Sequence, residues 1–549
     1  MSAPDHPPDP PRRRWRLTAA LVVTAALVAP LSGSPKVASP NELVRVELAL
    51  ALAMWGTVDL DRPALTYGLS EDVARRDGRV LADKAPGLSL AAVPVVWLSA
   101  RLLPPRPGSD LPAYWPLRHL LTAVLVVLST VWLGMGVMPK LSGVDSGATV
   151  AVPMLAILAT PLWTYGSVFF GHAPAAMLVA TAWLLLLGPA SSFPKTPDGT
   201  GVVPGREPAS DLRRLGLALL GGIAAGWAVA TEYPTIVLVL VIAVTLVVRR
   251  TPLPQLVAVA GGTALGVMPM LVYHQAAFGA PWLTGYAFKA DPGFSQIHDS
   301  GLVGVGAPTL GALWGVLFSS SRGLFFFSPL LLLAPVGLWL MVRRSGWRDA
   351  GPLVVAIGLY IAFASGFSDW RAGWGAAARH LVPAVPLLFV PTIKAASAMA
   401  RRGWSLFVVV ALVALAATRT ALTVAVSPFF PPELGHPLTE LVLPSLGDGA
   451  VAPTILSTLL PLPNWTTPTV LAVLIAGVLI WSLSRLVGRD WRRIAVLFLA
   501  VVALQVTWLA WRSTIREPDR EQLRAQWLVM VGHEEAGRRL ADDLEVRTP

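Results

Sequence analysis

Two charged motifs near the start of the chain could carry chemistry. NELVR begins at Asn41 and DKAPG begins at Asp83, and hydrophobic stretches surround both. Charges are costly to keep beside membrane-type segments, so those that are kept are usually functional. Glu42 is therefore a candidate general base, and Asp83 and Lys84 are candidates for binding an anionic substrate. A helix-end salt bridge of Glu42 with Arg45, or an interfacial anchor at the second motif, would explain the same residues without chemistry.

Three later segments add candidates of a different kind. GHAP returns His172 to the membrane surface, SSSRG contains Arg322, and DWRAGWG leads through Trp374 to Arg379 and His380. Tryptophan and glycine beside arginine suit a site that stacks a sugar ring while the guanidinium binds phosphate. A hydrogen-bonded structural histidine and an aromatic belt with an anchoring arginine are the alternatives.

Together these residues describe group transfer from a phosphate leaving group. A carboxylate would deprotonate the attacking hydroxyl, and the lysine and arginines would stabilise the charge on the departing phosphate. The other acidic residues between the two motifs are interpreted as solvated, and Glu232 as a cap between two helices. The solvated set comprises Asp59, Asp61, Glu71, Asp72 and Asp77.

Composition indicates the class of protein that positions these residues. The 549 residues are 54% hydrophobic and 14% charged, with a mean hydropathy of +0.62. These values predict an all-α polytopic membrane protein. The net charge of +11 comes from arginine pairs at the ends of apolar stretches, which indicate topology and not nucleic-acid binding. The absence of cysteine excludes disulfides and thiolate metal sites, and the chain offers no strong metal cluster.

The arginine pairs also predict the topology. Fourteen apolar stretches could span, but the pairs fall on the inner face when one early stretch does not cross. The best candidate is 86–103, which can lie in the interface or re-enter, and about thirteen spans then remain. Residues 1–14 then form a cytoplasmic tail before an uncleaved first helix. From Asn41 to Trp55 we expect a helix along the outer leaflet, capped by Asn41. The segments assigned to the outer face are 32–116, 164–171, 231–234, 273–328, 367–380, 427–467 and the tail 512–549. The loop 273–328 has no strong regularity and is predicted to be a lid or a binding loop.

The order of NE, DKAPG and WGAAARHLVPAVP resembles the GT-C membrane glycosyltransferases. The protein O-mannosyltransferase and lipid A aminoarabinose transferase group is the most similar. This resemblance implies a catalytic transmembrane core over 15–400, including the interfacial helices of the first outer loop, followed by C-terminal transmembrane helices over 401–511. Asn41 stands where that group commonly has aspartate, which moves the role of base to Glu42. His172 stands where the aminoarabinose-transferase type has the aspartate of Asp-x-Pro.

The resemblance and the chemistry together predict an enzyme. It would transfer a sugar from a polyprenyl-phosphate-linked donor to a cell-envelope glycan, lipid or protein at the outer face of a bacterial plasma membrane, with inversion at the anomeric carbon. Asp83 would either orient Lys84 or bind a divalent cation; no other cofactor is expected. Substrate binding is assigned to Arg45, Asp83, Lys84, His172, Arg322, Trp374, Arg379 and His380. The alternatives are a flippase or transporter of lipid-linked saccharides and an enzyme of the O-antigen polymerase or ligase type.

Overall fold

The structure is a computed structural model. It describes residue 37 and the ranges 39–102, 148–188, 208–299, 301–400, 403–451, 466–487, 490–513, 518–531 and 534–547. The expected cytoplasmic tail 1–14 and the apolar stretch that follows it lie outside these residues. So do the expected span 117–137 and parts of the expected outer segments, including 103–116.

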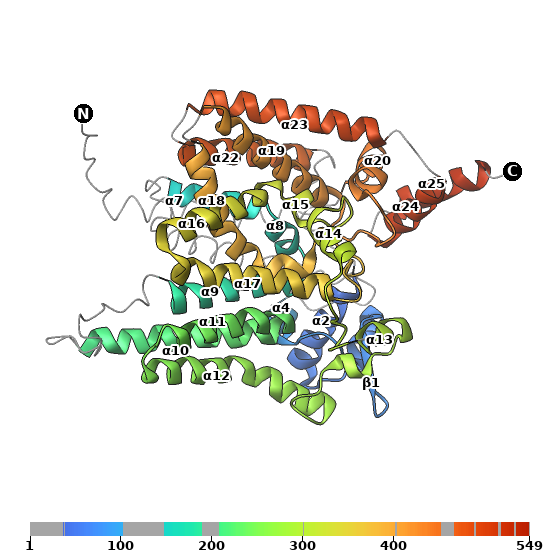
Figure 1. Cartoon of the computed structure of the whole chain (residues 1–549). Coiled ribbons are helices and arrows are strands. Elements are labelled where there is room, and N and C mark those ends of the chain that lie inside the picture. The colour runs from blue at the N-terminus through green and yellow to red at the C-terminus, as the bar shows by residue number, and fades with distance from the viewer. Residues whose placement is uncertain are drawn as a thin grey trace, which may run out of the picture.

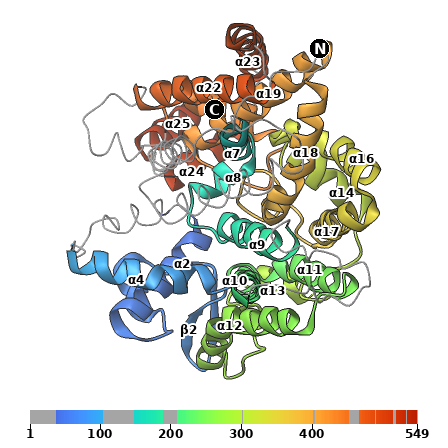
Figure 2. The same cartoon turned by 90° about the vertical axis from the view of Figure 1, so that its left-hand side faces the viewer.

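The described chain is mostly helical, as its composition predicts, and forms a multi-pass membrane protein. Long apolar helices run side by side, with the C-terminal helices on one side of the bundle and α10 and α12 on the other (Figures 1 and 2). Six helices in the described part are long and apolar enough to cross a membrane, against about thirteen spans expected for the whole chain. The main helices are α7 (Ala148–Leu158), α9 (His172–Leu187), α10 (Pro208–Thr231), α11 (Ile236–Val248), α12 (Leu253–Phe278), α16 (Ala334–Ser345), α17 (Trp347–Gly366), α18 (Val385–Met399), α19 (Gly403–Val426), α22 (Thr466–Val487) and α23 (Trp491–Ser513).

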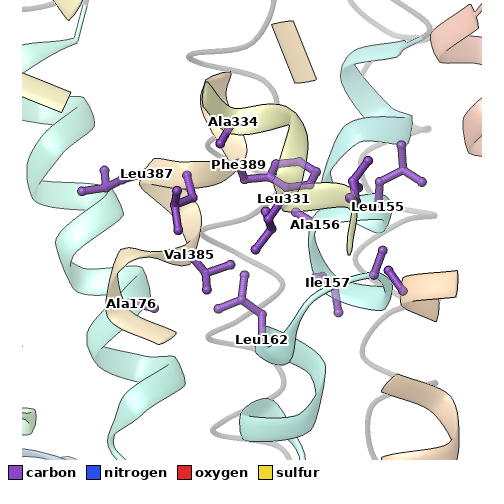
Figure 3. Packing of buried hydrophobic residues seen from close by; sticks show 14 of the residues in the cluster. Leu155, Ala156, Ile157, Leu162, Ala176, Leu331, Ala334, Val385, Leu387 and Phe389 are labelled. Carbon is purple, nitrogen blue, oxygen red and sulfur yellow. The ribbon is translucent and has the colours of Figure 1, made fainter. Parts of the chain in front are cut away.

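The core lies where α18 meets α7, α8 (Pro161–Gly166) and η5 (Pro329–Leu333). Leu155, Leu162, Leu331, Val385 and Phe389 point into this region (Figure 3), and all five are buried. Aliphatic and aromatic side chains in contact at this density supply most of the apolar burial that holds the helices together.

Helices α10 and α12 approach each other closely through glycines. A Cβ atom on Gly226 would lie 2.2 Å from the carbonyl oxygen of Thr263, and one on Gly262 would lie 2.2 Å from that of Leu219. On α10 the glycines Gly222 and Gly226 are four positions apart, as are Gly262 and Gly266 on α12. Small residues at this spacing allow two membrane helices to pack backbone against backbone. Helix α10 ends at Thr231, and the segment 231–235 that begins there contributes to the functional site.

The segments assigned to one face of the membrane do gather at one end of the bundle. Arg45 bonds Glu232, and the backbone amide of Gly375 bonds the carbonyl of Phe430. At the other end of α11, Arg249 lies 3.8 Å from Asp349. The described polar loops and Arg249 therefore lie at opposite ends of the bundle, as the positive-inside assignment groups them.

The first outer segment differs from the prediction in its secondary structure. Helix α2 (Pro40–Leu50) continues as the π-helix η1 (Ala51–Trp55), and its N-cap is Ser39 and not Asn41. Proline at the first helical position sets this boundary, since its missing N–H needs no partner there. Helix α4 (Gly87–Leu102) covers the stretch predicted to lie in the interface, and it packs on α2.

A β-hairpin corrects the all-α prediction. Strands β1 (Val73–Arg76) and β2 (Arg79–Ala82) pair antiparallel around a turn at Asp77 and Gly78. Both turn residues have positive φ, 51° and 77°, as a type I′ turn requires. The Asp-Gly pair is the usual sequence signal for this turn. The preceding segment includes the short helix α3 (Asp61–Tyr67).

The loop 273–328 is also more regular than predicted. Its first residues belong to α12, and it then forms η4 (Gly285–Phe288), α13 (Pro292–Asp299) and α14 (Leu310–Phe318). The C-terminal tail forms a helical hairpin of α24 (Pro518–Met530) and α25 (Glu534–Arg547), at the same end of the bundle as the polar loops (Figure 1). Trp527 anchors this hairpin by donating to the carbonyl of Phe429 at 2.7 Å.

Candidate functional site

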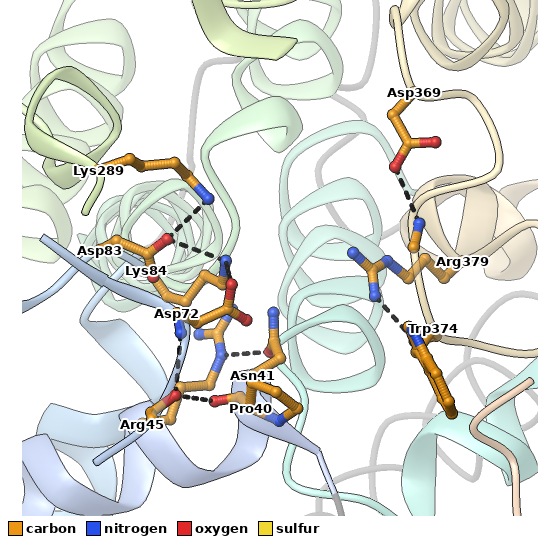
Figure 4. A network of polar contacts seen from close by, with 12 residues as sticks. Pro40, Asn41, Arg45, Asp72, Asp83, Lys84, Lys289, Asp369, Trp374 and Arg379 are labelled. Atoms are coloured by element: carbon orange, nitrogen blue, oxygen red, sulfur yellow. Dashed lines mark hydrogen bonds and ion pairs between the residues drawn. The ribbon is translucent and has the colours of Figure 1, made fainter. Parts of the chain in front are cut away.

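Four charged side chains form a buried ion network. The Nζ atom of Lys84 lies 3.0 Å from Asp72 Oδ1 and 3.1 Å from Asp83 Oδ2, and the Nζ atom of Lys289 lies 2.9 Å from the same Asp83 oxygen (Figure 4). The Asp83 side chain is fully buried and that of Lys84 is 11% exposed. Charges buried to this extent stabilise each other, because removing one partner leaves the other as an uncompensated buried charge.

The hairpin explains how the network is assembled. Val73 pairs with Ala82 at the end of the hairpin farthest from the turn. The next residues, Asp72 and Asp83, therefore stand opposite each other there. Lys289 reaches them because η4 runs along β1, where the amide of Ala290 donates to the carbonyl of Val73 at 3.0 Å.

Gly285 in η4 makes this approach possible. A Cβ atom at Gly285 would lie 2.4 Å from the Cα atom of Asp83. No other residue type could bring the two backbones so close, so this glycine fixes the position of the strand end that carries the aspartate.

The electrostatics of the network favour charged side chains at Asp72 and Lys84. Burial raises the pKa of Asp72, but Lys84 and Lys289 outweigh burial and hold the pKa below its ordinary value. Burial lowers the pKa of Lys84, but Asp72 and Asp83 outweigh it and raise the pKa. Burial and the charge of Lys84 lower the pKa of Lys289. Lys84 is therefore a fixed cation at neutral pH.

A second set of contacts centres on Arg45. Its Nε donates to Asn41 Oδ1 at 3.1 Å, its Nη1 to the carbonyl of Ala85 at 2.9 Å and its Nη2 to Glu232 Oε1 at 2.8 Å. Glu232 is thus a carboxylate partner of Arg45 that the sequence did not indicate. Arg45 thus ties α2 to the DKAPG motif and to the end of α10, and its guanidinium is used in positioning them.

Glu232 joins Arg45 to His172. The Nδ1 atom of His172 lies 2.9 Å from Glu232 Oε1, the oxygen that also bonds Arg45. Burial raises the pKa of Glu232, but His172 and Arg45 outweigh burial and lower the pKa to about 2. Gly171 leaves room for the carboxylate, since a Cβ atom there would lie 2.3 Å from Glu232 Oε1. Glu232 is therefore an ionised carboxylate at neutral pH.

Glu42 lies on the first turn of α2 and is fully buried. Its Oε1 accepts the backbone N–H of Phe169 at 2.8 Å, so the carboxylate is fixed against the segment that leads into α9. Glu42 thus stands between two elements of the site, one residue from Asn41.

Arg379 faces the network from the opposite side (Figure 4). Its Nη1 donates to the carbonyl of Trp374 at 3.2 Å, and its charge helps to lower the pKa of Asp72. Within the part of the chain that the structure describes, its Nε is buried and has no hydrogen-bond partner. Buried donors are nearly always satisfied, so an unsatisfied one in a polar region points to a missing ligand.

His380 and Arg322 belong to the same region but differ in what they do. The His380 ring lies 5.9 Å from that of His172, and its Nε2 has no partner among the described residues. Arg322 is buried and donates to four carbonyls, so its guanidinium holds three loops together. The four acceptors are Ser321, Arg371, Gly373 and Phe430.

The structure brings most of the predicted residues together and adds three. Glu42, Arg45, Asp83, Lys84 and His172 meet on one side, and Trp374, Arg379 and His380 lie on the other. Sequence reasoning did not select Asp72, Glu232 or Lys289. The Asp-Gly turn could have identified Asp72, because a hairpin around it places the residues before and after its strands side by side.

The lysines occupy the position at Asp83 where a divalent cation was considered from the sequence. Asp83 shares one oxygen between two lysines, and Lys84 is oriented by two aspartates. Across the described residues, no group of three histidine or carboxylate side chains is placed to hold a metal ion.

No protein-family model and no curated protein matches the chain. Solved structures do. ArnT from Cupriavidus metallidurans in the apo state is 18% identical, with 95% of this chain and 77% of that chain covered and a TM-score of 0.47. Arabinosyltransferase EmbB from Mycobacterium smegmatis is 13% identical, with 98% and 42% covered and a TM-score of 0.40. The Archaeoglobus fulgidus oligosaccharyltransferase is 12% identical, with 73% and 56% covered and a TM-score of 0.40.

These solved structures are GT-C glycosyltransferases, the superfamily that the sequence motifs resemble. ArnT was also solved bound to undecaprenyl phosphate; that structure is 15% identical, covers 89% of this chain and 78% of its own, and has a TM-score of 0.42. With TM-scores this low, the function proposed below rests on the residues of the site and not on these likenesses.

Proposed function

We propose that the protein is a membrane glycosyltransferase that takes its sugar from a polyprenyl-phosphate-linked donor at the outer face of a bacterial plasma membrane. One observation carries the proposal. Lys84 is a fixed cation held by Asp72 and the fully buried Asp83, and Arg379 faces it with an unsatisfied, buried Nε within the described structure. Two cations held apart in this way suit a phosphate that must be bound and then released with an additional negative charge.

The proposed roles follow from these positions. Lys84 and Arg379 bind the donor phosphate, and Asp72, Asp83 and Lys289 keep Lys84 charged and oriented. Glu42 acts as the general base: the Phe169 amide fixes its buried carboxylate, which accepts the proton of the acceptor hydroxyl. The hydroxyl oxygen bonds to the anomeric carbon as the bond from that carbon to the phosphate breaks, so the configuration inverts. The phosphate leaves as the anion and needs no proton.

The remaining residues position these groups. Arg45 and Glu232 hold the DKAPG motif and His172, while Arg322 fixes the loop that contains Trp374. Trp374 and the neighbouring glycines would form the surface against which the sugar stacks. A cell-envelope glycan, lipid or protein would supply the acceptor hydroxyl.

The test measures whether the lipid-linked sugar accumulates when the protein is absent. In a strain lacking the protein, mass spectrometry should detect a polyprenyl-phosphate-linked sugar that accumulates, and wild-type protein should clear it. Glu42→Gln should fail to clear it while expressing at the wild-type level. Clearance by Glu42→Gln would remove Glu42 as the base, and the absence of any accumulated lipid-linked sugar would contradict the proposed donor. A flippase would instead leave the same lipid trapped on the inner leaflet, where an impermeant reagent that reacts with the sugar cannot reach it.

A further inference from the structure

Arg419 is a charge within an apolar helix. It lies on α19, which is long and apolar enough to cross a membrane, where a charge is costly. Its Nη1 donates to the carbonyl of Phe326, and its guanidinium lies 4.2 Å from the centroid of the Phe326 ring. Its Nε is buried without a partner, and no carboxylate in the described chain pairs with it. The contacts to Phe326 orient the cation but leave its charge uncompensated.

His436 lies on another side of the same phenylalanine. Its ring meets that of Phe326 edge-on at 5.3 Å and that of Trp508 at 6.2 Å. The Nε2 atom of His436 is buried and has no hydrogen-bond partner in the described structure. A second buried polar atom beside Arg419 is therefore left without a partner.

Arg512 completes the group from the end of α23. It lies over Trp508, with 5.8 Å between the guanidinium carbon and the ring centroid. Burial lowers the pKa of His436 to about 4, and the charges of Arg512 and Arg419 act in the same direction. Both arginines are thus close enough to the imidazole to affect its titration, and the imidazole is neutral at pH 7.

The neighbouring carboxylate does not compensate these cations. Glu440 Oε1 accepts the backbone N–H of His436 at 2.9 Å, and its other oxygen lies 3.9 Å from the Nε of Arg520. An anion from outside the chain would satisfy the buried Nε of Arg419 and the buried Nε2 of His436, and the exposed Arg512 lies where it would add a second cation.

The surroundings indicate that this anion belongs to a lipid. Along α23, Leu504, Trp508 and Trp511 are 73%, 47% and 64% exposed, which gives an apolar stripe that ends in two tryptophans and Arg512. Tryptophan is typical of the level where lipid headgroups meet acyl chains. Guanidinium groups match the geometry of phosphate oxygens, and acyl chains would lie along the stripe.

We propose that Arg419, His436 and Arg512 bind the phosphate of an anionic acyl phospholipid, at a site separate from the one around Lys84. The phosphate oxygens accept hydrogen bonds from the two guanidinium groups and from the imidazole Nε2–H. Headgroup and chains lie against α19 and α23, so the lipid joins the C-terminal helices to the loop that contains His436.

Native mass spectrometry of the purified full-length protein tests this proposal. The protein is loaded with equal amounts of phosphatidylglycerol and phosphatidylcholine and then activated by collision. Wild-type protein should keep one phosphatidylglycerol after phosphatidylcholine has been lost, and the mass distinguishes this lipid from polyprenyl phosphate. Arg419→Gln and Arg512→Gln should each reduce retention at least tenfold. Arg512 is exposed, so its variant is expected to fold even where Arg419→Gln is not recovered.

Arg343→Gln is the matched control. Arg343 also lies over an exposed tryptophan, Trp339, at 4.5 Å, but on α16 at the opposite end of the bundle. This variant should retain phosphatidylglycerol as the wild type does. Three results would each overturn the proposal: wild-type retention by Arg512→Gln, equal retention of the two lipids, or displacement of the lipid by millimolar inorganic phosphate, which would indicate a site for a small free anion.

Discussion

Two ion networks lie at the polar end of the molecule, and they differ in how far carboxylates compensate the arginine beside or within them, although the Nε atoms of Arg524 and Arg379 are both buried without a hydrogen-bond partner among the described residues. In the C-terminal hairpin, the fully buried Arg524 bonds two carboxylates, Asp448 and Glu521. Around DKAPG, two lysines meet two aspartates, and the guanidinium of Arg379 stands beside them, bonded to the backbone carbonyl of Trp374.

The difference separates a structural role from a binding role. Arg524 has more negative charge around it than it needs, and one of its carboxylates, Asp448, is 43% exposed to water. The DKAPG network balances itself and has an additional cation next to it. Burial of charge alone is weak evidence of function, since structural pairs are buried too. An uncompensated cation is the more informative sign.

The sharpest way to break this comparison is to remove one cation from each network. Lys84→Ala should reduce sugar transfer by at least a thousandfold, because the donor phosphate loses its fixed cation. Arg524→Ala should leave transfer within a few fold and lower stability by about 3–5 kcal/mol, as expected when a buried pair loses one partner. Transfer assays and chemical denaturation of both purified variants measure this. Comparable transfer by the two variants would mean that the networks do not differ in role.

Stability against acid should also depend on the site. Glu232 has an ordinary pKa of 4.5 and a folded-state pKa of about 2, so its contribution of about 3 kcal/mol is present above pH 4.5. It should be lost as the pH falls from about 4.5 towards about 2. Glu232→Gln should flatten this part of the stability profile, measured by thermal unfolding between pH 2 and 6. An unchanged slope in Glu232→Gln would contradict the assignment.

A smaller effect is expected at Arg379. Arg379→Gln should weaken binding of undecaprenyl phosphate about tenfold, equivalent to about 1.4 kcal/mol, since one of two cations is lost. Its packing against Phe170 would be largely kept by glutamine. Arg371→Gln is a suitable control, since Arg371 lies in the same loop but over Trp370. Equal affinity of the Arg379 and Arg371 variants for this probe would argue that Arg379 does not meet the phosphate.

Sequence predicted which segments meet but not which atoms pair. Glu42, Lys84, His172 and Arg379 were selected from their motifs, and the arginine pairs assigned their loops to one face; these loops do gather at one end of the bundle. The role of Asp72 was missed because a mixed acidic and basic loop usually remains solvated. The contact of Lys289 with Asp83 depends on the approach of η4 to the hairpin, which no local pattern encodes.

The smallest effect on transfer is expected at Gly78. A substitution there distinguishes the placement of Asp72 opposite Asp83 from the overall stability of the protein. Gly78→Ala puts a side chain at φ 77°, which costs about 1 kcal/mol in the left-handed region. Gly56→Ala carries a similar penalty at φ 63°, and at both positions an added Cβ would meet no atom within 4 Å. Only Gly78 lies in the turn that sets Asp72 opposite Asp83. Both variants should therefore lose about the same stability in denaturation, while Gly78→Ala alone should lower transfer, by about threefold to tenfold. Equal loss of transfer in the two would show that the hairpin contributes to the site only through global stability.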